Sequence, residues 1–62
     1  MYEVFIADCK REMRLRRMTN GDLAKATGYT KSSINAFFSD ISAREKSETV
    51  AKAISVALGV EI

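Results

Sequence analysis

The fold is decided by residues 19–38, which read TNGDLAKATGYTKSSINAFF. The first half of this stretch carries the signals of a helix start, because Thr19 can accept a hydrogen bond from an early free backbone N–H group. Asp22, three residues on, places a negative charge in the first turn, where the helix dipole favours it. Gly28 adopts a positive φ without strain and can therefore end the helix. These signals predict a short helix over about residues 20–27.

A second short helix is predicted over about residues 31–39, with Thr30 as its candidate N-cap. Gly28 lets the chain reverse direction in very few residues, and the small side chain of Ala24 allows the two helices to cross closely. Two short helices joined by a turn with glycine have the layout of a helix-turn-helix motif, here over about residues 20–39. The N-terminal end of the second helix then stands exposed. Its free N–H groups and partial positive charge suit phosphate groups and base edges.

Two further helices are predicted outside this motif. One runs from about residue 2 to residue 17, and the other begins after the candidate cap Ser47 and is stopped by Gly59. Residues 40–46 are interpreted as a loop or an irregular turn, with Ile41 turned inward. No segment combines strand alternation with hairpin turns, so the predicted fold class is all-α. The residues expected on the core-facing stripes are Tyr2, Phe5, Ile6, Cys9, Met13, Leu23, Ala24, Thr27, Ile34, Phe37, Phe38, Val50, Ala51, Ile54, Ala57 and Leu58.

Length and composition exclude several classes of protein. With 62 residues, the chain is long enough for one small domain, residues 1–62, whose core must come from close helix packing. The single cysteine excludes a disulfide framework, and the absence of histidine argues against a zinc site and leaves little for acid–base catalysis. Cys9 lies among apolar residues at helical spacing and is expected in the core. We therefore expect no enzymatic activity, no metal, no cofactor and no small-molecule ligand.

The composition also bears on where the protein acts. No stretch approaches the ~18 consecutive apolar residues of a membrane span, and the N-terminus lacks the basic leader of a secretory signal. A soluble cytoplasmic protein with no membrane partner is therefore the default expectation. The net charge of +2 neither favours nor excludes a nucleic-acid partner. Residues 1–39 lean basic, with seven Lys and Arg side chains against four Asp and Glu.

The motif resembles a known family. Leu23-Ala24, followed by GYTKSSI at residues 28–34, matches at the right spacing the core pattern of the Cro/C1-type helix-turn-helix proteins. These are the lambda-repressor-like or XRE class of phage and bacterial regulators. Residues 47–54 and the closing Leu58-Gly59-Val60 are similar to the family's later segment, so the resemblance covers nearly the whole chain. It implies a small lambda-repressor-like helix-turn-helix bundle of four to five helices.

Two positions depart from the family pattern. Asp40 stands where many members have the glycine that ends the recognition helix, and Asp adopts the left-handed conformation only at some cost. Ala36 stands where a longer polar reader is frequent. An alanine can offer only a methyl group there, for instance to thymine, so we expect modest or methyl-dependent base discrimination at that position.

The resemblance also implies which residues meet DNA. Lys31 and Ser32 occupy positions that reach base edges in the major groove, where Lys31 can donate to guanine O6 and N7; alternatively, Lys31 is a solvated surface lysine. Asn20 stands at the start of the first motif helix, where the family often places an amide against a phosphate. The full set predicted to bind DNA is Asn20, Thr30, Lys31, Ser32, Ser33, Asn35, Ala36, Ser39, Arg44 and Lys46.

Several members of this set have alternative roles. Thr30 and Ser33 can cap the second motif helix, bind phosphate, or do both in turn. Asn35 faces outward at the flank and can contact adenine. Ser39 follows one turn later, where it can reach a phosphate. Arg44 and Lys46 follow the recognition helix, in a loop that family geometry places near the DNA backbone.

The remaining surface features allow two interpretations each. The basic residues of the first helix form either a solvated face with local ion pairs or, at Arg14 or Arg17, additional phosphate contacts. Leu15 and Val56 fall outside the core stripes of their helices. They are either isolated exposed hydrophobes or part of a self-association surface with Val60 and Ile62. Because one recognition helix reads few base pairs, we expect a weak homodimer through the C-terminal region.

The sequence therefore predicts a sequence-specific DNA-binding transcription regulator. Its expected partner is double-stranded DNA carrying a palindromic operator, and its expected type is a small phage- or mobile-element-type repressor that acts by operator occlusion. The alternative is a helix-turn-helix module used for protein–protein interaction, as an antirepressor or an assembly component, since a fold does not fix a function.

Overall fold

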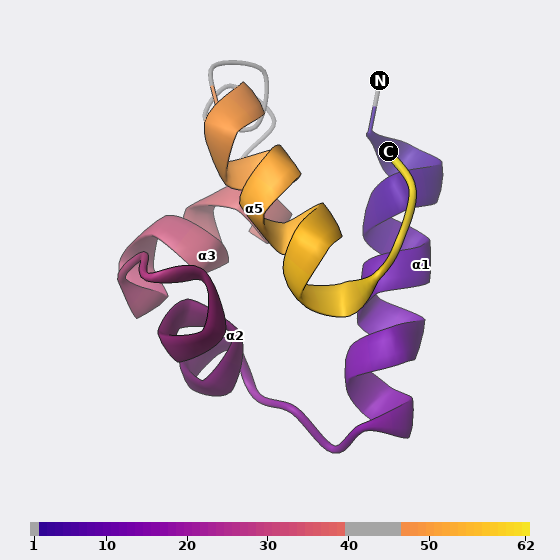
Figure 1. The fold of residues 1–62 in the computed structure, drawn as a ribbon, viewed down its shortest axis with the longest axis horizontal. Coiled ribbons are helices and arrows are strands. Elements are labelled where there is room, and N and C mark those ends of the chain that lie inside the picture. The colour runs from indigo at the N-terminus through magenta and orange to yellow at the C-terminus, as the bar shows by residue number, and fades with distance from the viewer. Residues whose placement is uncertain (1, 40–46) are drawn as a thin grey trace.

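The computed structural model describes residues 2–39 and 47–62, which form four helices and no strand (Figure 1). These helices are α1 (Glu3–Leu15), α2 (Asn20–Thr27), α3 (Lys31–Ser39) and α5 (Glu48–Leu58). The predicted all-α class is confirmed, α2 has both of the bounds that the capping signals predicted, and α3 begins where Thr30 predicted. The described residues do not include Asp40, Ile41, Arg44 and Lys46, so the structure does not test the expectations for them.

The end of α1 differs from the prediction, because the helix stops at Leu15 rather than near Arg17. Arg17 has a left-handed φ of 55°. Its backbone N–H donates to the Arg14 carbonyl at 3.2 Å, and the Met18 N–H donates to the Met13 carbonyl at 2.8 Å. This pair of bonds is the Schellman arrangement, in which the left-handed position is usually glycine. An arginine there gives no sequence signal for a helix end.

The start of α2 is a capping box. The Thr19 hydroxyl accepts a hydrogen bond from the Asp22 N–H at 3.1 Å, and the Thr19 N–H donates to the Asp22 carboxylate at 2.9 Å. At the other end, Gly28 has a φ of 82° and its N–H donates to the Ala24 carbonyl at 2.9 Å. Thr19 and Gly28 therefore set both ends of α2, as the sequence predicted.

The last helix, α5, ends as predicted and begins without the predicted side-chain bond. Gly59 has a φ of 68°, and its N–H donates to the Ser55 carbonyl at 2.8 Å. The Ser55 hydroxyl in turn donates to the Val60 carbonyl. Ser47 occupies the N-cap position, but its side chain makes no cap hydrogen bond. The geometry of the residue explains this, because its φ of −117° and ψ of 48° are not those of an extended N-cap.

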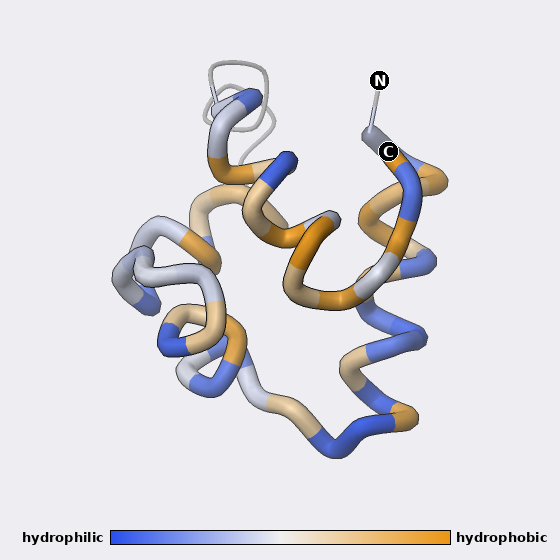
Figure 2. Tube along the Cα trace, in the orientation of Figure 1, coloured by the Kyte–Doolittle hydropathy of each residue, from blue (hydrophilic) through white to orange (hydrophobic). Residues whose placement is uncertain are grey.

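The core lies between the four helices, and every buried hydrophobic residue that the structure describes falls on a predicted stripe. Figure 2 shows hydrophobic residues recurring at helical intervals along each helix. Phe37 is at the centre, with the Phe5 ring edge-on to it at a centroid distance of 6.2 Å. Cys9 is fully buried, and desolvation, followed by the charge of Asp8, raises the pKa of its thiol to about 12. Cys9 is therefore a core residue, as predicted, and its thiol is protonated at neutral pH.

Helix α5 packs against α1, α2 and α3, so it holds the helix-turn-helix pair to the rest of the fold (Figure 1). Helices α2 and α3 pack against each other, and Leu23 and Ile34 bury the inner side of that pair. This packing leaves the opposite side of α3 facing outward. None of the helices in the described part of the chain is long and apolar enough to cross a membrane.

Candidate nucleic-acid interface

The interface begins at the N-terminus of α3, which Thr30 caps. The Thr30 hydroxyl accepts a hydrogen bond from the Ser33 N–H at 3.1 Å and donates to the Ser33 hydroxyl at 3.0 Å. Thr30 was expected to cap α3, to bind phosphate, or to do both, and the structure shows that it caps the helix. Ser33 is half-buried and its hydroxyl oxygen is tied to Thr30, so Ser33 is less accessible than Ser32 beside it, which is exposed.

The outer face of α3 carries short polar side chains and one cation. Lys31, Ser32, Asn35 and Ser39 are exposed, whereas Ala36 is half-buried. Ser32, Asn35 and Ser39 follow one another at helical spacing, so they share one face. No carboxylate belongs to α3, which removes one source of repulsion against a phosphate backbone. The structure therefore places the predicted residues together on the outward face of α3, where Ala36 is less exposed than the others.

A hydrogen bond between two amides joins this face to the start of α2. Asn20 Nδ2 donates to Asn35 Oδ1 across the helix-turn-helix pair. An amide oxygen has a second lone pair and an amide nitrogen has two protons, so Asn35 retains the groups that pair with a base. Asn20 likewise retains one Nδ2 proton for a phosphate. The bond fixes the Asn35 amide plane, and it links a predicted phosphate ligand to a predicted base reader.

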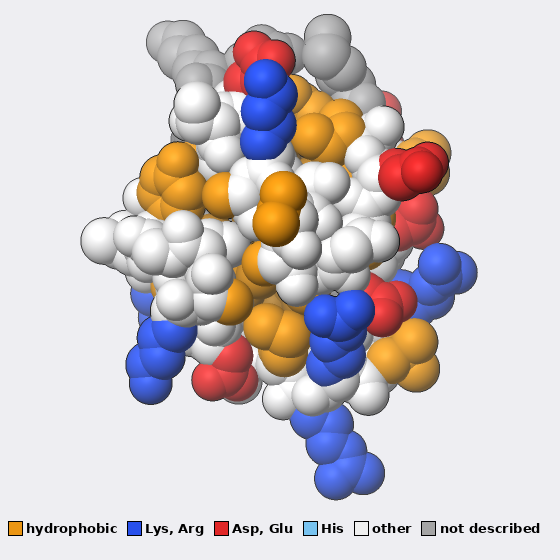
Figure 3. Space-filling view, in the orientation of Figure 1, with side chains coloured by type: hydrophobic (Ala, Val, Ile, Leu, Met, Phe, Trp, Pro, Cys, Tyr) orange, Lys and Arg blue, Asp and Glu red, His pale blue; other side chains and the backbone are white. Residues whose placement is uncertain are grey.

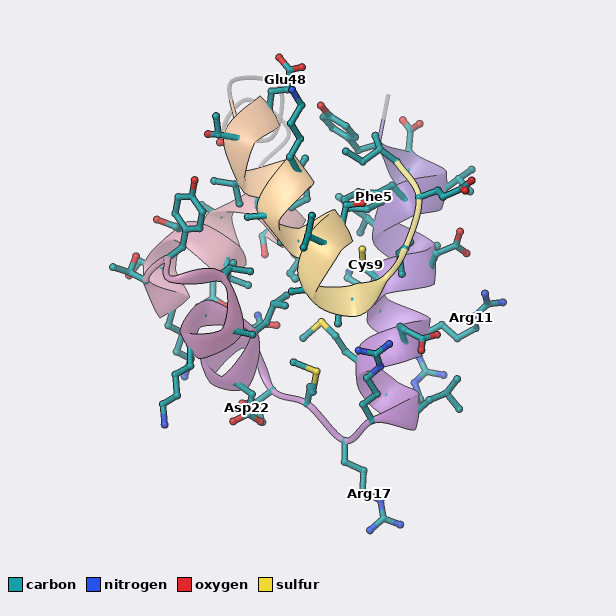
Figure 4. The ribbon with its side chains drawn as sticks, in the orientation of Figure 1. Phe5, Cys9, Arg11, Arg17, Asp22 and Glu48 are labelled. Atoms are coloured by element: carbon teal, nitrogen blue, oxygen red, sulfur yellow. The ribbon has the colours of Figure 1, made fainter. Side chains whose placement is uncertain are left out.

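Asp22 follows Asn20 by two residues, and its carboxylate accepts a hydrogen bond within the capping box. The hydrogen bond from the Thr19 backbone N–H, and then the bond with the Thr19 side chain, lower the pKa of Asp22 below its ordinary value. Asp22 therefore stays ionised at neutral pH, where it complements the positive end of the α2 dipole. Figure 4 shows Asp22 at the start of α2, on the outside of the fold.

The basic residues of α1 and of the connection that follows it have different roles in the structure. Arg16 caps the C-terminus of α5: its Nη2 donates to the Leu58 carbonyl at 2.9 Å and its Nη1 to the Ala57 carbonyl at 3.5 Å. Its Nε also pairs with Glu12 at 3.3 Å. Sequence reasoning missed this role. One signal was present, because α5 has no basic residue in its own last turn to balance the negative end of its dipole.

Two other arginines point away from the core. Arg11 pairs with Asp8 at 3.7 Å, and because the Arg11 side chain is exposed and that of Asp8 is only partly buried, this pair adds little to stability. Arg17 extends outward from the connection between α1 and α2 (Figure 4). Within the described part of the chain, neither of these two side chains caps a helix.

Three of the four residues considered for a self-association surface are exposed in the structure. Leu15, Val56 and Ile62 are 72%, 85% and 59% exposed, as expected for residues outside the core stripes. Val60 instead packs against the core, so it belongs to the fold. Val56 lies at the edge of a concavity of about 380 Å³ between α2 and α5, whose lining also includes Ala26 and Ala53. Figure 3 shows hydrophobic side chains spread over this side of the molecule among polar ones.

Comparison with known proteins agrees with this geometry. A family model described as helix-turn-helix, the Cro/C1-type or XRE family, matches residues 10–62. No curated protein and no solved structure matches the chain. The match covers most of the chain and includes α2, its turn and α3. The chain therefore belongs to the Cro/C1-type helix-turn-helix family, whose fold is a small all-α, lambda-repressor-like bundle and whose members are DNA-binding transcription regulators.

Proposed function

We propose that this chain is a sequence-specific DNA-binding repressor of the phage- or mobile-element type, which acts by occluding its operator. The observation that carries the proposal is the outward face of α3, where Lys31, Ser32 and Asn35 are exposed beside a capped helix start and no carboxylate lies on the helix. In this account α3 enters the major groove, and phosphate contacts fix its register.

Each exposed residue of the face has a separate task in this proposal. Lys31 donates to guanine O6 and N7, Ser32 contacts a neighbouring base edge, and the fixed Asn35 amide pairs with a base. Asn20 and Ser39 bind phosphates at the two ends of the face. Thr30 and Ser33 hold the N-terminus of α3 in position, and the Ala36 methyl group offers at most an apolar contact to thymine.

The operator is proposed to be palindromic and bound by two copies of the chain. A single α3 reads few base pairs, whereas two copies spaced by one helical turn of DNA double the site. The exposed Leu15, Val56 and Ile62 supply apolar surface for such a weak homodimer. Occupancy of the operator then depends on the concentration of the chain, since two copies must assemble on it.

A second candidate function is a protein-interaction module. It is favoured by the 85% exposure of Val56 beside the concavity between α2 and α5. Such a module would use this side of the molecule and leave the face of α3 unoccupied. The two candidates differ in one property that is simple to measure, because only the DNA-binding function makes Lys31 necessary.

The test compares Lys31→Ala with Lys52→Ala. Both changes remove one positive charge, but Lys52 lies on α5, where it pairs with Glu48 at 3.6 Å in an exposed position. We expect Lys31→Ala to weaken binding to a selected duplex by about 1–3 kcal/mol and to relax the sequence preference at one position. Lys52→Ala is expected to bind as the wild type does. If Lys31→Ala keeps the affinity and preference of the wild type, the assignment of α3 as the reading helix is wrong.

A further inference from the structure

We infer that the outward face of α1 is a contact between two copies of this chain, whose α1 helices lie antiparallel to each other. The face is a stripe made of Val4, Asp8, Arg11 and Leu15. The contact does not require DNA, and it uses α1 rather than Val56 of α5, so it is additional to the proposed function and to the dimer described there.

The stripe lies on the side of α1 that the core leaves uncovered. Its residues follow one another at intervals of four, three and four, so they lie within about 60° of each other around the helix. This is the spacing of the contact positions in helices that pair side by side. Phe5 and Cys9 of the same helix are buried, whereas Arg11 points away from the fold (Figure 4). Val4 and Leu15, at the two ends of the stripe, are 76% and 72% exposed, so both gain from leaving water.

The order of the residues along the stripe identifies the partner as a second copy. The midpoint of Val4 and Leu15 lies between residues 9 and 10, and the midpoint of Asp8 and Arg11 is the same. When two identical helices pair antiparallel about a two-fold axis at that point, Val4 meets Leu15 of the second copy. Asp8 likewise meets Arg11 of the second copy. Both apolar side chains are then covered, and each charge faces an opposite one.

Other arrangements match the stripe less well. A parallel pair would place Asp8 against Asp8 and Arg11 against Arg11, and like charges repel. A partner surface with charges of one sign would be repelled by one of the two residues. Within one chain the Asp8 carboxylate and the Arg11 guanidinium lie 3.7 Å apart, so two antiparallel copies bring together four charges of alternating sign. A second copy is therefore the occupant that fits this face.

The stripe lies apart from the surface that is proposed to face DNA. Lys10 and Arg14 line a concavity beside α2 and α3, whose other wall includes Asn20. On the helix, these two cations are centred about a third of a turn away from the stripe, so a duplex on α3 leaves the stripe open. Because the stripe covers one side of a 13-residue helix, the contact is small, and free copies associate through it only at high concentration. Under the proposed function, DNA holds copies near one another and thereby strengthens the contact.

The test reverses charges on the stripe. NMR spectra of the free chain at millimolar concentration are compared with those of diluted samples, and we expect dilution to shift the amide signals of the stripe in the wild type. Asp8→Arg and Arg11→Asp should each weaken this association about tenfold, because each change sets like charges against each other at two symmetric places. Lys52→Asp reverses a charge of the exposed Glu48–Lys52 pair on α5 and is the matched control, expected to associate through α1 as the wild type does.

Mixing the two α1 variants gives a second, sharper comparison. In a mixed pair every charge of the stripe again faces an opposite charge, so the equimolar mixture should associate about as tightly as the wild type. A role of Asp8 and Arg11 within one chain cannot give this recovery, because mixing leaves each chain unchanged. If the mixture associates no better than the separate variants, or if dilution of the wild type shifts no signal on α1, the contact is refuted. Either result leaves the proposed function standing, because no DNA is present. Circular dichroism checks that each variant is folded.

Discussion

Arg17 has a backbone conformation that side-chain-bearing residues rarely adopt. Its φ of 55° places it at the left-handed position after α1, where the two hydrogen bonds of the helix end require this geometry. A non-glycine residue in this region costs roughly 1–2 kcal/mol. The chain nevertheless has an arginine there, and its side chain extends into solvent (Figure 4).

Replacing Arg17 with glycine should therefore stabilise the protein. We expect Arg17→Gly to raise the free energy of unfolding by about 0.5–1 kcal/mol, because the relief of strain exceeds the added entropy of the unfolded chain. Arg17→Ala keeps the Cβ atom and serves as the control, with stability close to that of the wild type. Urea unfolding measures all three proteins. A glycine variant that unfolds at a lower urea concentration than the wild type would show that Arg17 is not strained.

At the same scale, Asp22 links stability to pH. Hydrogen bonds from Thr19 lower the pKa of Asp22 in the folded protein relative to the unfolded chain. The stability that this carboxylate contributes is therefore present above its ordinary pKa of 3.8 and is lost as the pH falls through the lowered folded value.

Asp22→Asn should remove this dependence. We expect the variant to be less stable than the wild type at neutral pH, because asparagine loses the charge at the start of α2. The difference should shrink as the pH falls through the folded pKa of Asp22. Thermal unfolding of the two proteins at a series of pH values measures it. A stability difference that stays constant down to the lowest pH would mean that the capping box does not depend on the charge of Asp22.

The sequence predicted the bounds of some helices better than those of others. Thr19 and Gly28 carry local signals for the two ends of α2, and Thr30 carries one for the start of α3; the structure has these three predicted bounds. The apolar stripes also predicted the buried residues, because helical spacing determines which side chains share a face. The end of α1 escaped prediction because Arg17 takes a position for which glycine is the usual signal.

Contacts between the helices could not be predicted from the sequence. Arg16 bonds to the end of α5, more than forty positions away in the chain, so its role depends on how α1 and α5 pack. The bond between Asn20 and Asn35 likewise depends on the crossing of α2 and α3. The concavity that contains Lys10 and Arg14 is formed by three separate helical segments. Periodicity places each of these residues on a helix face but does not identify its partner.

For the whole molecule, the proposed dimer makes a prediction about association. If Val56 lies in the dimer contact, Val56→Lys should abolish self-association, because a charge would be buried against apolar surface. It should leave the fold intact, since Val56 is 85% exposed. Analytical ultracentrifugation of the wild type and the variant, alone and with a palindromic duplex, makes the comparison. A wild type that sediments as a strict monomer both free and on DNA would refute the dimer.

For the whole molecule, the proposed function requires that the outward face of α3 recognise a particular DNA sequence. The most direct measurement selects binding sites from a pool of random duplexes with the wild-type chain, then compares the selected duplex with a shuffled one near physiological salt. We expect one recurring site, bound about a thousandfold more tightly than the shuffled duplex, with affinity for both falling as salt rises. A pool without an enriched site, or equal affinity for the two duplexes, would contradict it.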